Sequence, residues 1–272
     1  MTDDRHDAVP DRTPPPATGD DGIWVALRRL TAARIGLQRT GASLATGPLL
    51  DFQLAHARAR DAVHEPLDEA RLIADLAGLE CPVLAIASAA ESRESYLMRP
   101  DLGRRLGPGA EAALAPHAAD HDVVFVVTGG LSARAVQTHA APVLAGVLPV
   151  LLAGGWRVAP VVVVRQGRVA IGDAIADALR ADCVVVLLGE RPGLSAPDSM
   201  GAYLTWQPGP DTTDADRNCI SNIRPEGIVT ADAAFKITHL LRGMRTRRLS
   251  GVRLKDDSDP LLLDGGETPG RS

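Results

Sequence analysis

The chain has 272 residues, of which 45% are hydrophobic and 23% are charged. This balance is typical of a folded globular protein and excludes disorder over most of the length. The 29 basic and 34 acidic residues give a formal net charge of −5, which disfavours binding to nucleic acid through a basic surface. No stretch approaches the roughly 20 apolar residues that a membrane helix requires.

The cysteine pattern points to a reducing compartment. Cys81, Cys183 and Cys219 are widely spaced and form no CxxC pair, which argues against a disulfide framework and against structural zinc. The first residues contain no apolar core of a secretory signal. We therefore expect a cytoplasmic protein.

Composition divides the chain into four regions. Residues 1–20, with prolines among Asp, Thr and Gly, predict a disordered tail. Residues 21–80 predict a small N-terminal helical domain, whose second helix begins at Gly47 and Pro48. Residues 81–255 alternate between strand and helix patterns, and residues 256–272 are predicted to be a flexible C-terminal tail.

The third region has the pattern of an α/β domain. Short β-branched and apolar runs predict strands at residues 83–87, 123–127, 161–164 and 184–188. Helical periodicity appears between them, most clearly from Val136 to Leu148, where Pro142 predicts a kink or a break. Continuous apolar strands that alternate with helices predict a parallel sheet with helices on both faces.

Glycine-containing loops follow these strands at residues 128–132, 165–169 and 189–193. The carboxyl ends of parallel strands share one edge of the sheet, where such folds bind ligands. Ordinary strand-to-helix turns also favour Gly and Ser, so each loop alone is compatible with a structural role. Their convergence favours a binding site, although none has the dinucleotide GxGxxG motif or a P-loop.

The polar candidates permit more than one interpretation. Glu190 follows a strand and would place a carboxylate on a bound amide or hydroxyl, or form a local ion pair. Cys219 lies in a polar segment that we interpret as a loop. Residues 92–106 concentrate arginines around Tyr96, which indicates a charged helix face or a subunit contact. Without a catalytic Ser, His, Asp or Cys set, these residues indicate an α/β domain that binds a sizeable polar ligand.

Several segments together resemble the small (light) subunit of ethanolamine ammonia-lyase, over about residues 27–253. They are residues 96–106 (YLMRPDLGRRL), 129–132 (GGLS), 165–169 (RQGRV), 189–194 (GERPGL) and 216–223 (DRNCISNI). The last two blocks, in this order and spacing, are the most specific.

The resemblance implies an adenosylcobalamin-dependent enzyme that converts ethanolamine to acetaldehyde and ammonia by a radical mechanism. Residues 81–255 would be a Rossmann-like cobalamin-binding domain that forms one wall of the cofactor site. The large subunit would bind ethanolamine and supply the other wall, in a hetero-oligomer usually described as six of each subunit. Neither a nucleic acid nor a membrane is an implied partner.

The resemblance also assigns cofactor contacts to Val169, Glu190 and Cys219, and it implies no catalytic residue on this chain. Glu190 would accept hydrogen bonds from corrin amides, whereas Val169 and Cys219 would supply packing or backbone contacts. A DxHxxG motif is absent, since His121 lacks that spacing, which agrees with base-on cobalamin. Residues 1–20 lack the apolar stripe of the helix that directs some relatives into a bacterial microcompartment.

Two other classes of function remain open. In the first, the chain is a stand-alone α/β protein that binds a nucleotide or a sugar. In the second, it is a subunit with a purely structural role in assembly. Binding of cobalamin in the presence of the large subunit separates the resemblance from both.

Overall fold

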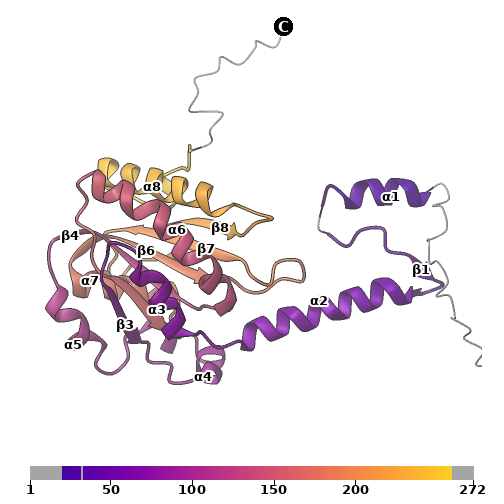
Figure 1. Ribbon diagram of the computed structural model, residues 1–272, viewed down its shortest axis with the longest axis horizontal. Coiled ribbons are helices and arrows are strands. Elements are labelled where there is room, and N and C mark those ends of the chain that lie inside the picture. Colours follow the sequence, from indigo (N-terminus) through magenta and orange to yellow (C-terminus); the bar gives the residue numbers. More distant parts are fainter. Residues whose placement is uncertain (1–19, 32, 259–272) are drawn as a thin grey trace, which may run out of the picture. The chain divides into compact units, whose positions relative to one another are not determined.

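The computed structural model describes residues 20–31 and 33–258. The predicted tails, residues 1–20 and 256–272, therefore lie almost wholly outside the described residues. The chain divides into two compact units, Met1–Leu54 and Ala55–Ser272, and Figure 1 labels most of their helices and strands.

The first unit holds a short helix, a small hairpin and the start of a longer helix. Helix α1 spans Asp20–Arg28, strands β1 (Arg39–Thr40) and β2 (Ser43–Leu44) pair antiparallel, and α2 runs over Thr46–His64. Pro48 lies in the first turn of α2, where its missing N–H removes no helical hydrogen bond. The predicted second helix is thus confirmed, and the hairpin is an addition that the sequence pattern does not indicate.

The second unit contains a six-stranded sheet with the order β3-β5-β4-β6-β7-β8. Its strands are β3 (Val83–Ala87), β4 (His121–Thr128), β5 (Val161–Arg165), β6 (Ala181–Gly189), β7 (Met200–Trp206) and β8 (Arg217–Ile223). Neighbours among β3, β5, β4 and β6 pair in parallel, whereas β7 pairs antiparallel with both β6 and β8. The α/β class and the four predicted strands are confirmed, and the sheet is mixed instead of parallel throughout.

The two antiparallel strands lack the continuous apolar runs that reveal the parallel ones. β8 is an edge strand with the sequence RNCISNI. Its exposed positions tolerate polar residues because one face of an antiparallel strand can meet water. Cys219 therefore lies within an edge strand, and its interpretation as a loop residue is wrong.

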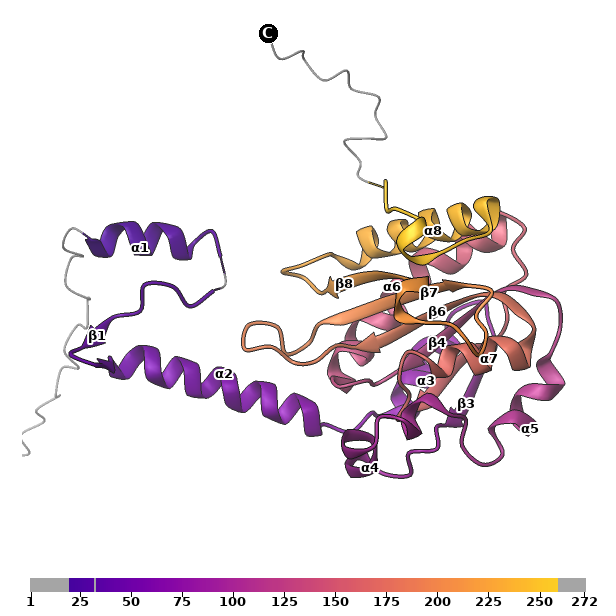
Figure 2. The same cartoon turned by 180° about the vertical axis from the view of Figure 1, so that it is seen from behind.

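Alternate residues of the central strands face two apolar layers. Phe125 and Val127 of β4 join the layer beneath α3, α6 and α8, and Val124 and Val126 join the layer beneath α5 and α7. The covering helices are α3 (Glu69–Ala77), α5 (Ala110–Leu114), α6 (Ala133–Ala153), α7 (Ile171–Leu179) and α8 (Thr230–Arg247). Figures 1 and 2 show α6 and α8 side by side on the sheet.

Helix α3 belongs to the core of the sheet unit. Its residues Leu72 and Leu76 are fully buried in the same layer as α6 and α8. Residues 55–80, which the composition groups with the N-terminal helices, thus lie in the compact unit that holds the sheet.

Helix α6 is long and apolar enough to cross a membrane by length and composition alone, contrary to the expectation that no such stretch exists. It continues through Pro142 and Pro149 and does not break at the first of them. In the most apolar stretch of this helix, 50% is buried inside the protein. The helix packs on β6 and α8, which is the position of a core helix in an α/β fold.

Gly189 ends β6 against the turn that precedes α6, and this contact provides a test of the fold. A Cβ atom there would overlap the Ser132 carbonyl oxygen and lie 2.6 Å from the Gly129 carbonyl oxygen. Because backbone atoms cannot rotate away, we expect Gly189→Ala to lower the free energy of unfolding by about 1–3 kcal/mol in urea titrations. Gly78→Ala is the control, since Gly78 has a φ of −73° and open space around it, so stability should hold or rise. Equal effects of the two substitutions would contradict this account.

Candidate functional site

The three glycine-containing loops meet at the carboxyl edge of the parallel strands, as predicted. The Thr128 hydroxyl accepts a hydrogen bond from the Gly167 amide (3.0 Å), and the Leu131 amide donates to the Gly189 carbonyl (2.9 Å). Gly130 has a φ of +55°, and a Cβ on it would lie 2.9 Å from the Gly189 nitrogen. The left-handed backbone and the lack of space both require glycine at position 130.

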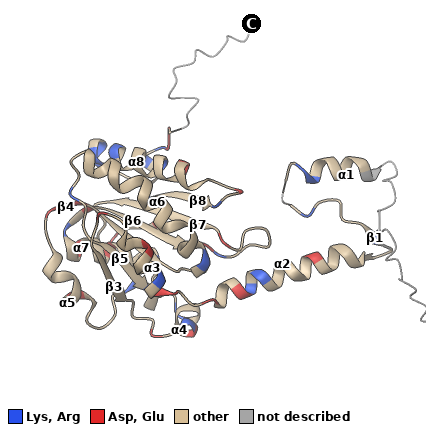
Figure 3. Ribbon diagram, in the orientation of Figure 1, with Lys and Arg blue, Asp and Glu red and all other residues tan. Residues whose placement is uncertain are grey.

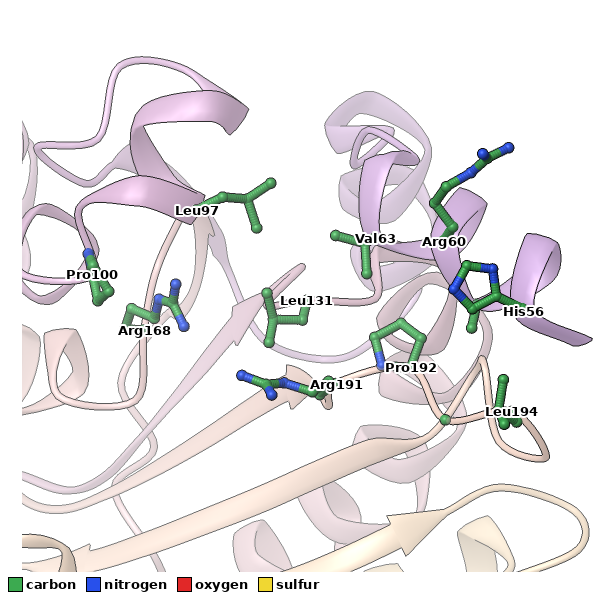
Figure 4. A pocket seen from close by; sticks show the side chains of 12 residues that line it. His56, Arg60, Val63, Leu97, Pro100, Leu131, Arg168, Arg191, Pro192 and Leu194 are labelled. Atoms are coloured by element: carbon green, nitrogen blue, oxygen red, sulfur yellow. The ribbon is translucent and has the colours of Figure 1, made fainter.

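Two adjoining cavities open at this edge, one of about 610 Å³ and one of about 620 Å³. Both are lined by Pro100, Leu131, Arg168 and Arg191, so they form one continuous concave surface. Figure 4 shows the first cavity, with Val63 of α2 on its wall. Each cavity lies within the range of volumes that accommodate a drug-sized ligand, and a larger ligand would extend across both.

Glu190 is anchored by hydrogen bonds from the edge strand β8 and from Ser199, the residue directly before β7. Its Oε2 accepts from the Ser199 hydroxyl (2.5 Å) and the Asn222 amide (3.2 Å), and its Oε1 accepts from the Ser221 hydroxyl (2.6 Å). These bonds replace the local ion pair that the sequence also permits. They fix the carboxylate in the wall of the second cavity.

Val169 and Cys219 occupy different positions relative to the cavities. Val169 lines the second cavity, whereas Cys219 is an exposed residue opposite Tyr203, which does line it. Groups packed around the Cys219 thiol raise its pKa by burial, and a hydrogen bond with Tyr203 partly offsets this effect, so the thiol is protonated at neutral pH. The structure thus brings Val169 and Glu190 into one cavity and places Cys219 beside Tyr203, outside the residues that line it.

A buried aromatic ring joins the loops, and its role is not evident from the sequence. Tyr96, on α4 (Arg93–Met98), is fully buried between two guanidinium groups. The Arg168 guanidinium lies 4.2 Å and the Arg93 guanidinium 5.0 Å from the ring centroid. Both distances are within the range of cation–π attraction.

Arg93 also connects separate parts of the backbone. It donates hydrogen bonds to the Val63 carbonyl at the end of α2 (2.6 and 2.9 Å) and to the Gly130 carbonyl (2.7 Å). Burial lowers the pKa of Arg93 from its usual value. These contacts show that Arg93 does not lie on a freely solvated helix face. The only sequence signal for its contact with Tyr96 is their i, i+3 spacing.

Arg217 is a second residue that sequence reasoning missed. Its side chain is 3% exposed, and it donates to both carboxylate oxygens of Asp173 on α7 (2.7 and 2.6 Å) and to the Thr205 hydroxyl (3.1 Å). Its Nε is buried with no hydrogen-bond partner among the described residues. Arg217 also lines the second cavity, where its Nε forms a longer ion pair (3.8 Å) with the exposed carboxylate of Asp214.

His121 and His139 line neither cavity, whereas His56 of α2 lines the first one. Within residues 20–31 and 33–258, no group of three or more His, Cys, Asp or Glu side chains is placed to hold a metal ion. His139 is a core histidine of α6, and burial lowers its pKa. His121 begins β4, at the opposite end of the strand from the cavities, and its Nε2 lies 3.0 Å from the His117 carbonyl.

The fold and the site define an α/β domain with a double, arginine-rich cavity at the carboxyl edge of its sheet, the edge at which such folds carry ligand sites. The family model described as Ethanolamine ammonia-lyase light chain (EutC) matches residues 21–255. The chain belongs to this family, and the predicted resemblance is confirmed.

Curated relatives are similar over nearly their whole length, and each is an ethanolamine ammonia-lyase small subunit. The protein from Ralstonia nicotianae is 51% identical over 270 residues, which cover 98% of this chain and 97% of the relative. The protein from Azotobacter vinelandii is 52% identical over 260 residues, with 94% and 96% coverage. The protein from Pseudomonas aeruginosa is 50% identical over 254 residues, with 92% and 93% coverage.

The buried pair of Arg217 and Asp173 provides a test of the geometry at the second cavity. Arg217→Met removes the partner of a carboxylate that is only 14% exposed, so we expect the free energy of unfolding to fall by about 3–5 kcal/mol. Urea unfolding at neutral pH measures this loss. Arg134→Met is the control, because its pair with Glu65 is exposed to water and should contribute far less. A loss no larger than that of the control would contradict the structural role.

Proposed function

We propose that this chain is the small subunit of an adenosylcobalamin-dependent ethanolamine ammonia-lyase and forms one wall of the cofactor site. Membership of the light-chain family over residues 21–255 is the observation that carries the proposal. The double cavity, with Val169 and Glu190 in its lining, is the surface that would face the cofactor. The large subunit would supply the other wall and the ethanolamine site.

The residues at the cavities fit a large ligand with many amide and polar groups. Glycines at positions 130 and 189 let the loop backbones approach closely. The Nε atoms of Arg168 and Arg217 are buried donors with no hydrogen-bond partner among the described residues. The Glu190 carboxylate accepts three hydrogen bonds of the roughly four that its two oxygens can take, which leaves capacity for one amide donor of a ligand.

When bound, adenosylcobalamin would supply the radical chemistry that converts ethanolamine to acetaldehyde and ammonia. This chain's own residues would hold and orient the cofactor and exclude water from one side of it. Glu190 would position an amide group, and Val169 would provide apolar contact. Cys219 would contribute packing or backbone contact through the β7–β8 ladder, consistent with its protonated thiol.

We also propose that the cofactor keeps its own base as the lower ligand. The chain has no DxHxxG motif. His121, the nearest approach to that motif, begins β4 at the end of the strand remote from the cavities. Its place in the fold therefore agrees with base-on binding.

The first unit offers a surface for the large subunit. Residues 20–54 expose ten large apolar side chains: Ile23, Trp24, Val25, Leu27, Leu30, Leu44, Leu49, Leu50, Phe52 and Leu54. Helices in proteins are stabilised mainly by packing of an apolar face, and extensive exposed apolar surface marks an interaction site. We propose that the large subunit covers these side chains, in an assembly of six large and six small subunits in the cytoplasm.

The competing functions differ in what the full-length chain binds by itself. A stand-alone nucleotide- or sugar-binding protein would bind such a ligand tightly, and the large subunit would not change its affinity. The proposed small subunit would instead retain cobalamin when the large subunit is present, measured by the absorbance of the corrin after gel filtration. Absence of corrin from the reconstituted pair would overturn the proposal.

Substitution of Glu190 distinguishes a cofactor contact from a purely structural role in assembly. We expect Glu190→Ala, co-produced with the large subunit, to raise the apparent KM for adenosylcobalamin about tenfold, because a charge-assisted hydrogen bond is lost. Assembly should remain intact in gel filtration. The control Glu111→Ala removes an exposed carboxylate on α5, away from the cavities. An unchanged KM for Glu190→Ala would support the structural alternative.

Helix α2 provides a test of the surface proposed for the large subunit. Leu50 and Leu54 are 57% and 50% exposed and lie on one helix face because they are four residues apart. We expect the double variant Leu50→Glu and Leu54→Glu to recover less large subunit when both chains are co-purified through a tag on this chain. Gln53→Glu, on the same helix, should recover the normal amount. Normal recovery with the double variant would show that this face is not the interface.

A further inference from the structure

The two cavities contain more arginine than their own carboxylates can neutralise. The first cavity is lined by Arg60, Arg168 and Arg191 and by no Asp or Glu. Arg168 and Arg191 also line the second cavity, so they lie where the two cavities join. A ligand that occupies this junction meets two guanidinium groups from different loops.

The carboxylates of the second cavity are committed to other partners. Glu190 accepts hydrogen bonds from Ser199, Ser221 and Asn222. Asp214 is fully exposed and lies 3.8 Å from the Nε of Arg217. Neither forms an ion pair with Arg168 or Arg191 in the described chain, which leaves the junction electropositive.

Arg168 is held in place by the rest of the protein. Its guanidinium stacks on the Tyr96 ring at 4.2 Å and donates to the Tyr96 carbonyl (3.0 Å), while its buried Nε has no partner among the described residues. Arg191 is exposed, and among the described residues its side chain forms no ion pair or hydrogen bond. Figure 4 shows the two guanidinium groups directed toward each other near Leu131.

Two converging guanidinium groups select an anion with several oxygens. The planar fork of arginine matches phosphate and carboxylate oxygens, and such charge-assisted hydrogen bonds are about twice as strong as neutral ones. Corrin side-chain amides carry no charge and do not require two arginines. Adenosylcobalamin has one peripheral anionic group, the phosphodiester that links its nucleotide tail to the corrin.

We propose that Arg168 and Arg191 form the seat of this phosphodiester, at the junction of the two cavities. The inference rests on the proposed function, because it takes adenosylcobalamin as the ligand. Arg168 would be the pre-organised half of the seat, since Tyr96 holds it before the ligand arrives. Arg191 would close on the phosphate from the third loop.

Three cofactor analogues separate the phosphate from the rest of the ligand. Equilibrium dialysis of the complex with the large subunit would compare adenosylcobalamin, adenosylcobinamide phosphate and adenosylcobinamide, which has neither phosphate nor base. We expect Arg191→Met to raise the Kd for the first two ligands about tenfold or more. The Kd for adenosylcobinamide should change by less than about twofold. Arg191→Lys, which keeps the charge but not the fork, should give a smaller loss.

The control variant is Arg242→Met, which removes an exposed arginine of α8 outside both cavities and should change none of the three Kd values. Figure 3 shows the basic residues of α8 in blue. Thermal unfolding and recovery of the large subunit establish that each variant folds and assembles. An equal loss of affinity for all three ligands, or no loss for any of them, would contradict the proposal that Arg191 binds the phosphodiester. A loss confined to ligands that carry the base would also overturn it, because it would assign Arg191 to the base.

Two further outcomes separate this inference from the proposed function. If the wild-type complex binds none of the three corrinoids, the proposed function itself fails, and the seat fails with it. If the wild-type complex binds all three and Arg191→Met alters none of the affinities, only the seat fails. Binding of adenosine monophosphate that weakens in Arg191→Met, without any change for the corrinoids, would instead assign the seat to a free nucleotide.

Discussion

The site depends on the close approach of two backbones at the end of the central strands. Gly189 lies against the carbonyls of Gly129 and Ser132, and Gly130 lies against Gly189 in turn. Side chains at these positions would push the first and third loops apart, and the hydrogen bond from Leu131 to Gly189 would then be lost. This contact determines the spacing between the loops that carry Leu131 and Arg191, and therefore the shape of both cavities.

The charged groups around the cavities are arranged by contacts away from the open surface. Arg93 binds backbone carbonyls of α2 and the first loop and stacks on Tyr96, whose ring in turn supports Arg168. Arg217 is held by Asp173 in the same way, through a bidentate pair with little exposure to water. Burial makes these contacts strong and specific, so the guanidinium groups of Arg93, Arg168 and Arg217 have defined positions without a ligand. A cofactor that binds there would meet donors that are already oriented.

The sequence predicted much of the fold because the relevant signals are local. The four parallel strands are continuous β-branched runs, and their burial on both faces removes the need for polar positions. Glycine in the loops after these strands was also a sound indicator, since a close backbone approach requires it. The edge strand β8 escaped prediction because its polar sequence satisfies the requirements of a half-exposed strand and of a loop equally well. Cys219 was misplaced for this reason.

What the sequence by itself determined is the α/β class, the edge of the sheet that carries the site, and the resemblance that the family comparison confirmed. Only the tertiary structure decided which side chains share a cavity. Val169 and Glu190 line the same surface, whereas Cys219 lies beside Tyr203 on the edge strand and is not part of the lining. The partners of Arg168 and Arg217 were equally invisible, because they come from segments up to 72 residues away in the chain. Periodicity and motifs report on neighbours along the chain, whereas these contacts form only when separate strands and helices pack together.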